Sequence, residues 1–292
     1  MPQLEHPYHD LSGGRWLRGN LHTHTTQSDG ERPMQAVVDD YAGRGYDFLM
    51  FSDHDTHTGP EQYAKLHAHE LLVLPGNEIT RNGPHLLHVN ASQRVEPHAD
   101  RQRVIDDIRT GPGFAIINHP NWEQHFNHCP FENLVRWQGY CGLEIYNGVI
   151  ERLDGNPYAT DKWDRLLAQG RRLWGFANDD SHTVTGDVAL GWNVVYATNR
   201  TVPAVVEALR RGRFYPSTGV VIRQITVRDQ TIRIETENAE RIVAYRNTGC
   251  RFTVADAAVI EVTVPDNASY VRFECLGRRG AMAWTQPFFV KR

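Results

Sequence analysis

Short apolar runs alternate with amphipathic stretches over residues 16–218 of the chain. The apolar runs, four to six residues long, are typical of buried strands and lie at residues 17–22, 48–51, 71–74, 86–90, 114–118, 143–146, 173–177 and 192–197. Apolar positions with helical spacing lie between many of them, at residues 33–44, 62–69, 101–109, 158–168 and 202–211. Gly45, Gly170 and Gly212 follow three of these stretches, where helices commonly stop. This alternation predicts parallel βα units, in a barrel or a doubly wound sheet.

After Gly219 the pattern changes to short β-type runs separated by turn-prone residues. Period-two alternation is visible in Ile232-Arg233-Ile234-Glu235, which is typical of a strand with one buried face. The sequence therefore predicts an N-terminal extension at residues 1–15, an α/β domain at residues 16–218 and a small antiparallel β-sandwich at residues 219–292.

Composition narrows the class of protein. The 292 residues carry a formal net charge of −4, which argues against a long nucleic-acid surface but not against a small anionic substrate held through bound cations. The four cysteines lack CxxC spacing, so a disulfide scaffold or a structural zinc knuckle is not expected. No apolar run reaches the length of a membrane span, and no signal-type segment opens the chain. We expect a cytoplasmic protein; its oligomeric state is not predicted.

Histidine placement gives the first chemical signal. All 15 histidines lie before residue 183, so the C-terminal domain contributes none. The motif Leu21-His22-Thr23-His24 ends a predicted strand, and Asp29 follows on the next turn. Residues two apart at the end of a strand point the same way, so His22 and His24 can face one ion.

Similar residues follow or lie within other predicted strands. Taken singly, each has an ordinary structural explanation, such as a strand-terminal cap or a satisfied core histidine. The set comprises Asp53-His54-Asp55, Glu78, His88, His119 and the pair Asp180 and His182. Together they indicate a shared site for several metals, because parallel α/β folds gather functional groups at the carboxyl ends of strands. A ligand set of His, Asp and Glu without Cys suits Zn²⁺, Mn²⁺ or Fe²⁺ and does not separate them.

In order along the chain, the HxH, DG, SDHD, GNE, NHP and DxH elements resemble those of the polymerase and histidinol phosphatase (PHP) family of phosphoesterases. The resemblance covers about residues 16–185 and implies a distorted seven-stranded, TIM-like βα barrel with metals at its mouth. It implies a first metal held by His22, His24, Glu78 and Asp180. It implies a second metal held by Glu78, His88 and His119, and a third held by Asp29, His54 and His182. Asp29 stands where some members have His, and His85 can take the place of His88.

The expected catalytic residues are Glu78, Asp180 and His182. Asp53 and Asp55 are expected to orient His54, and His85 and Asn147 to lie near the substrate. Two cations sharing one water can lower its pKa enough for attack at neutral pH. This chemistry supports hydrolysis, and the resemblance implies a phosphoesterase with two or three divalent metals, acting on a small phosphate mono- or diester.

Two other functions stay open. The layout of a PHP-like domain followed by a β-sandwich also resembles a branch that includes carbaryl hydrolases, so the same metals could serve a carbamate or carboxylic ester. The third hypothesis is a non-catalytic binding module that metal supports. A structural metal site is normally closed, whereas nine potential ligands for up to three ions leave open positions, which argues against this hypothesis.

Overall fold

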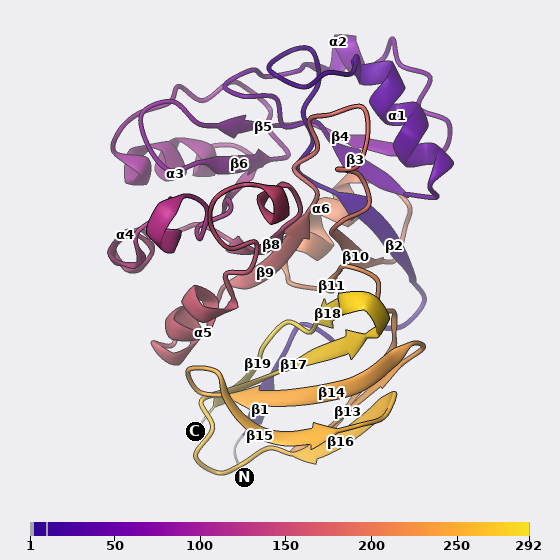
Figure 1. The fold of residues 1–292 in the computed structure, drawn as a ribbon, viewed down its shortest axis with the longest axis vertical. Coiled ribbons are helices and arrows are strands. Elements are labelled where there is room, and N and C mark those ends of the chain that lie inside the picture. Colours follow the sequence, from indigo (N-terminus) through magenta and orange to yellow (C-terminus); the bar gives the residue numbers. More distant parts are fainter. Residues whose placement is uncertain (1–2, 10, 292) are drawn as a thin grey trace.

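The computed structural model describes residues 3–9 and 11–291. Its upper part in Figure 1 combines two β-sheets with six α-helices, and its lower part consists of antiparallel strands. The helices are α1 (Met34–Gly43), α2 (Pro60–Tyr63), α3 (Arg101–Arg109), α4 (Phe131–Arg136), α5 (Thr160–Ala168) and α6 (Val202–Arg210). Three short 3₁₀ helices are η1 (Gln124–Phe126), η2 (Val149–Arg152) and η3 (Arg278–Gly280).

The upper part is built on two separate sheets. The first contains β2 (Arg15–Asn20), β3 (Phe48–Met50), β4 (Leu72–Leu74), β10 (Trp192–Ala197) and β11 (Phe214–Ser217). The second contains β5 (Gly76–Ile79), β6 (Leu86–Val89), β7 (Phe114–Ile117), β8 (Gly142–Asn147) and β9 (Trp174–Asn178). Pairing is parallel along β2–β3–β4 and β7–β8–β9, and antiparallel at β10–β2, β10–β11, β5–β6 and β6–β7.

The mixed α/β fold agrees with the sequence prediction, but the described residues do not form the closed seven-stranded barrel. Residues 80–85 alone connect β5 to β6, and a parallel crossover needs a dozen or more residues, so β6 returns antiparallel. Pro75, which has no N–H to donate, separates β4 from β5. Single parallel bridges join the two sheets, one between His54 and Glu78 and one between Thr23 and Ser181.

Apolar side chains from both sheets form one core between them. Phe48 and Met50 of the first sheet pack with Leu87, Ile116 and Phe176 of the second, and all five are fully buried. Helices α3, α4 and α5 cover the second sheet, and α1 packs on β3. The sheets are thus fixed relative to one another, and the loops at their ends start from rigid positions.

The lower part in Figure 1 has two antiparallel layers around a second core. One layer is β12 (Ile222–Arg228), β13 (Thr231–Thr236) and β16 (Val259–Thr263). The other contains β1 (Gln3–Glu5), β14 (Ala239–Arg246), β15 (Cys250–Ala255), β17 (Tyr270–Gly277), β18 (Met282–Trp284) and β19 (Phe288–Lys291).

The first sheet of the upper part and the second layer of the lower part are joined, among the described residues, into one eleven-stranded sheet. Strand β11 pairs with β18 at Ser217 and Ala283, and β1, from the predicted extension, pairs with β19. Buried Arg272 on β17 also donates hydrogen bonds to Asp164 on α5, at 2.6 and 2.7 Å. The predicted boundaries at residues 15 and 218 stay a prediction. Among the described residues, no helix is long and apolar enough to cross a membrane.

Candidate metal centre

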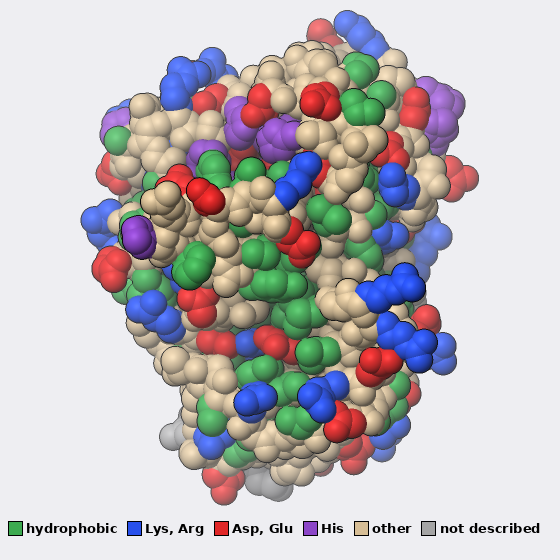
Figure 2. Space-filling view, in the orientation of Figure 1, with side chains coloured by type: hydrophobic (Ala, Val, Ile, Leu, Met, Phe, Trp, Pro, Cys, Tyr) green, Lys and Arg blue, Asp and Glu red, His purple; other side chains and the backbone are tan. Residues whose placement is uncertain are grey.

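Residues from six segments of the chain meet at one end of the two sheets. They follow β2, β3, β7 and β9, lie within β5 or precede β6. We call this group the His/Asp/Glu cluster: His22, His24, Asp29, His54, Glu78, His85, His119, Asp180 and His182. Figure 2 shows histidine side chains gathered on the upper half of the molecule. The carboxyl ends of the parallel strands bring these segments together.

Asp180 faces the two histidines of the HxH motif. Its Oδ1 atom lies 3.0 Å from Nε2 of His22 and 3.1 Å from Nε2 of His24. All three residues are buried. This arrangement follows from the strand geometry, since His22 and His24 point to the same side, and it provides three donor atoms for one ion.

Glu78 lies at the centre of the cluster. Its fully buried carboxylate also accepts a hydrogen bond from Nδ2 of Asn118 at 2.6 Å. Four imidazoles approach its two oxygens within 2.8–3.3 Å: His22, His54, His85 and His119. A carboxylate contacted from several sides is suited to bridging two cations, as the sequence resemblance implied.

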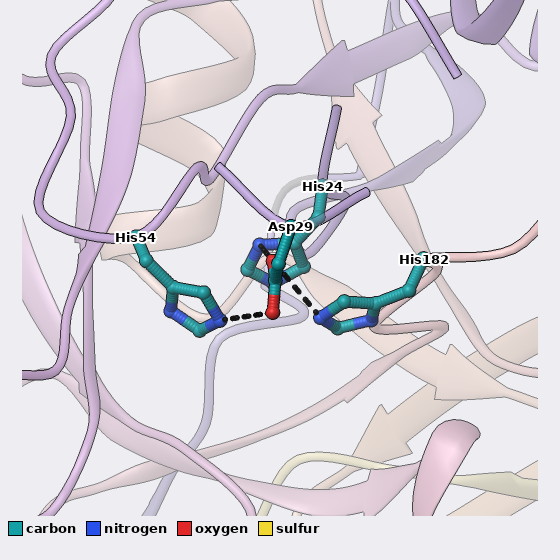
Figure 3. Close-up of side chains that lie close together, drawn as sticks. All are labelled: His24, Asp29, His54 and His182. Carbon is teal, nitrogen blue, oxygen red and sulfur yellow. Dashed lines mark ion pairs between the residues drawn. The ribbon is translucent and has the colours of Figure 1, made fainter. Parts of the chain in front are cut away.

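Asp29, His24, His54 and His182 form a further group, drawn in Figure 3. Oδ2 of Asp29 lies 3.3 Å from Nε2 of His54, and Oδ1 lies 3.6 Å from Nε2 of His182. The Asp29 side chain is 56% exposed, whereas His24 is buried. This group therefore lies at the solvent side of the cluster. Its Asp29 turn needs Gly30, because a Cβ there would lie 2.5 Å from the His24 backbone.

Many nitrogen and oxygen atoms of the cluster have no hydrogen-bond partner in the described part of the chain. Eight buried atoms in it have no hydrogen-bond partner among the described residues: Nε2 of His22, both ring nitrogens of His24, Nδ1 of His54, Oε2 of Glu78, Nδ1 of His85, Nδ1 of His119 and Oδ1 of Asp180. Buried polar atoms are rarely left unpaired, because each costs about 1–3 kcal/mol. Divalent cations would bind one nitrogen of an imidazole and the carboxylate oxygens, so the residues present fit a metal centre.

The electrostatics of the cluster favour positive charge. Burial by itself opposes a charged His22, but the carboxylates of Asp180, Glu144 and Glu78 raise its pKa well above the usual range. Burial likewise opposes ionisation of Glu78, and the surrounding imidazoles, with His22 the largest effect, hold its pKa well below the usual range. Protons and metal cations therefore compete for the same donor atoms.

Glu144 is a site residue that the sequence analysis did not select. It lies within β8, is buried, and its Oε1 accepts from Nδ1 of His22 at 2.8 Å. It also accepts from the backbone N–H of His119 and from the side-chain amides of Asn147 and Asn178, at 2.8–2.9 Å. The bond to Nδ1 directs the other nitrogen of His22 toward Asp180 and Glu78. The available signal was a carboxylate inside an otherwise apolar run.

His88, expected as a ligand, is not brought to the cluster. On β6 it pairs with Asn77, whereas Leu87 pairs with Glu78. Residues directly opposite in a sheet share a face, so His88 points to the face away from Glu78. His85 lies two residues before Leu87, so both side chains point to the same side of the strand. Nδ1 of His85 lies 3.2 Å from Oε1 of Glu78. The alternative residue, His85, therefore occupies the expected position.

His128 lies close to His85 and His119, but both of its ring nitrogens are already engaged. Nε2 accepts from the backbone N–H of His85 at 3.0 Å, and Nδ1 lies 3.1 Å from a carboxylate oxygen of Glu123. Burial, followed by the neighbouring His119, lowers the pKa of His128 to about 2. His128 thus supports His85 and is not placed to bind metal itself.

Asp53 and Asp55 have different contacts from those expected. Asp53 accepts hydrogen bonds from the N–H and hydroxyl of Thr25, at 2.8 and 2.9 Å. Asp55 accepts from the N–H and hydroxyl of Thr80, at 3.0 and 3.2 Å. They hold the loops beside His54 and do not orient its ring.

Asn147, expected near the substrate, lies under the cluster. Its Nδ2 donates to Glu144 at 2.8 Å and to Oδ2 of Asp180 at 3.1 Å, and the residue is fully buried.

Two residues of the cluster have a left-handed backbone, His119 at φ 22° and Asp180 at φ 57°. Such strain in non-glycine residues is typical of functional sites.

Comparison with solved structures finds a two-domain protein from Bacteroides vulgatus that contains a predicted PHP-like metal-dependent phosphoesterase. The match has a TM-score of 0.58 at 18% sequence identity and covers 94% of each chain. This chain has a PHP-like fold. The resemblance noted in the sequence is thus confirmed for the fold. Nothing in the comparison tests the narrower resemblance to carbaryl hydrolases, which stays a prediction.

Two weaker matches cover part of the chain. One is a protein from Bifidobacterium adolescentis whose metal-dependent phosphoesterase activity is inferred, with a TM-score of 0.45, 17% identity, and coverage of 58% of this chain and 88% of that one. The other is an amidohydrolase from Chromobacterium violaceum, with a TM-score of 0.40, 18% identity, and coverage of 58% and 89%. No protein-family model and no curated protein matches the sequence.

In this PHP-like fold, a pocket of about 310 Å³ opens beside the His/Asp/Glu cluster. Residues of the cluster form one wall, and apolar side chains form the other: Trp122, Val149, Ile150 and Leu153. A pocket of about 380 Å³ beside Arg172 and Arg213 is larger, but the described residues place no group of possible metal ligands there. The chemistry of the lining therefore identifies the smaller pocket as the candidate active site.

Proposed function

We propose that this protein is a metal-dependent hydrolase that cleaves a small phosphate mono- or diester at the His/Asp/Glu cluster. The observation that carries the proposal is the convergence of buried, unpaired imidazole nitrogens and carboxylate oxygens beside an open pocket. A structural site is normally closed, whereas a catalytic site keeps room for water and substrate.

The residues divide among up to three cations. His22, His24 and Asp180 would hold one, and Glu78 would bridge it to a second held by His85 and His119. Asp29, His54 and His182 would hold a third at the solvent side. When bound, such cations lower the pKa of water and offset charge on phosphoryl oxygens. The nitrogen and oxygen donors suit Zn²⁺, Mn²⁺ or Fe²⁺.

The chain itself contributes orientation and charge. Glu144 fixes His22 through Nδ1, and Asn147 donates to Oδ2 of Asp180 and so restrains that carboxylate. Glu78 and Asp180 are the proposed catalytic carboxylates, because both reach the pocket and face several imidazoles. His182 also lines the pocket, its side chain is 23% exposed, and its Nδ1 donates to the carbonyl of Asp180 at 2.8 Å. Its Nε2 can therefore exchange a proton with a leaving group when no third cation is bound to that nitrogen.

The test is turnover by protein stripped with a chelator and reloaded with Zn²⁺, Mn²⁺ or Fe²⁺. We expect hydrolysis of p-nitrophenyl phosphate or bis-p-nitrophenyl phosphate to return with at least one metal, and Asp180→Asn to abolish it while the circular dichroism spectrum is unchanged. Asp107→Asn, an exposed change on α3, is the matched control. Hydrolysis of p-nitrophenyl acetate alone would favour an acyl ester as the substrate. Absence of turnover with every metal would contradict the proposal.

A further inference from the structure

The wall opposite the His/Asp/Glu cluster is apolar. Val149 and Ile150 of η2 are 7% and 2% exposed, while Leu153, which follows them, is 49% exposed. The ring of Trp122 packs against those of His85 and His119, with centroids 5.6 and 5.1 Å apart. Figure 2 shows hydrophobic side chains next to the histidines on this face. A ligand at the metals would therefore also touch apolar surface.

Backbone contacts hold this wall in place. Trp122 forms an antiparallel bridge with Gly155, and the N–H of Glu123 donates to the carbonyl of Asp154 at 3.0 Å. Gly155 has a φ of 122°, and a Cβ there would lie 2.6 Å from the carbonyl oxygen of Asn121. The loop after β7 and the loop after η2 therefore form one preformed surface.

Apart from the histidines of the cluster, the described side chains that line the same pocket offer no cation. None of the described residues that line it is Lys or Arg. The guanidinium of Arg152 lies 3.1 Å from Asp187, and that of Arg81 lies 3.4 Å from Asp55, so both are paired with carboxylates outside the pocket lining. A second phosphate or carboxylate placed against the apolar wall would lose its hydration without gaining a charged partner there.

We propose that the substrate of this site carries an aromatic or branched aliphatic group next to the group that binds the metals. This apolar group would lie on Trp122, Ile150 and Leu153. The inference rests on the proposed function for the position of the reacting group, and it deepens that proposal by naming the substrate class. A polyphosphate or a sugar phosphate does not match this wall, because it would place charges or hydroxyl groups against apolar side chains.

The test is binding of two non-hydrolysable probes, phenylphosphonate and methylphosphonate, to Mn²⁺-loaded protein by isothermal titration calorimetry. We expect phenylphosphonate to bind about tenfold more tightly, the lower end of what apolar contacts in a pocket discriminate. Leu153→Asn should reduce this preference from about tenfold to about threefold, which is half on a logarithmic scale. Val184→Asn is the matched control, because Val184 is 62% exposed and does not line the pocket.

Equal affinities for the two probes, or a preference that Leu153→Asn leaves unchanged, would overturn the inference. Turnover of phosphate esters is measured separately. If esters are cleaved and the probes bind equally, only the inference fails. If no ester is cleaved and the preference is found and depends on Leu153, recognition of an apolar group stands and the proposed reaction fails.

Discussion

Replacing Glu144 by Gln should weaken metal binding without removing any metal ligand. Each carboxylate oxygen of Glu144 accepts two hydrogen bonds. Oε1 accepts from His22 and Asn178, and Oε2 accepts from the His119 N–H and from Asn147. A glutamine of the same shape must turn its NH₂ group toward one of these pairs, where two donors already point.

The neighbours cannot easily adapt to the change. Asn178 is fixed because its Oδ1 already accepts from the N–H of Leu21 at 3.1 Å. A buried donor without a partner costs about 1–3 kcal/mol. Loss of such a carboxylate behind a metal-binding histidine commonly lowers metal affinity by about 10- to 100-fold, or about 1.4–2.8 kcal/mol at about 1.4 kcal/mol per tenfold. The two estimates agree, so we expect a loss in that range.

The assay is competition with a chromogenic chelator, using wild-type protein, Glu144→Gln and the control Glu207→Gln on α6. Glu207 forms an ion pair with Arg211 on the surface and is not one of the possible metal ligands, so its variant should bind metal like the wild type. An affinity of Glu144→Gln within about twofold of the wild type, with the fold intact, would refute the reasoning.

Three further predictions follow from the same geometry. His85→Ala should lower the metal content of the protein by about one ion per chain while His88→Ala leaves it unchanged, measured by inductively coupled plasma mass spectrometry; the reverse result would restore His88 as a ligand. Although burial opposes it, Asp29 and Glu78 raise the pKa of His54 to about 10, so His54 must lose a proton when metal binds. Chelator competition between pH 6 and 9 should therefore show metal affinity rising with pH, and an affinity independent of pH would contradict this. Arg101→Met should lower the free energy of unfolding by about 3 kcal/mol in urea denaturation, because the buried guanidinium donates to five loop carbonyls; a loss below about 1 kcal/mol would show that these bonds matter little.

Strand periodicity was sufficient to anticipate most of the cluster. His22 and His24 end one apolar run, His119 ends another, and Asp180 and His182 follow a third. The structure brings these residues together because their strands present the same end to one edge of the sheets. Local pattern therefore located the site, even though the sheet arrangement was only partly predicted.

Other features depended on pairing that a single sequence does not contain. Choosing between His85 and His88 requires the register of β5 against β6, which decides which residues share a face with Glu78. Glu144 looked like part of an apolar strand, because three of its four hydrogen-bond donors, on His22, His119 and Asn178, come from distant segments. Likewise, closure of a barrel is decided by how strands at its two seams pair, and the apolar runs alone do not determine this.

Short elements were also missed or misjudged. Helix α4 has six residues, too few for a clear helical period, and α2 ends at Tyr63 although apolar spacing continued to residue 69. Strand β15 has no buried residue, so it showed no clear apolar alternation. None of these elements contributes a residue to the cluster.

The most direct test of the account is the metal stoichiometry of the protein. Protein stripped with a chelator, dialysed against Mn²⁺ and freed of unbound metal should hold about two or three ions per chain, and Asp180→Asn should hold at least about one fewer. Wild-type protein that retains almost no metal, or an Asp180→Asn variant with the wild-type ratio, would contradict the claim that these buried imidazoles and carboxylates form a metal centre.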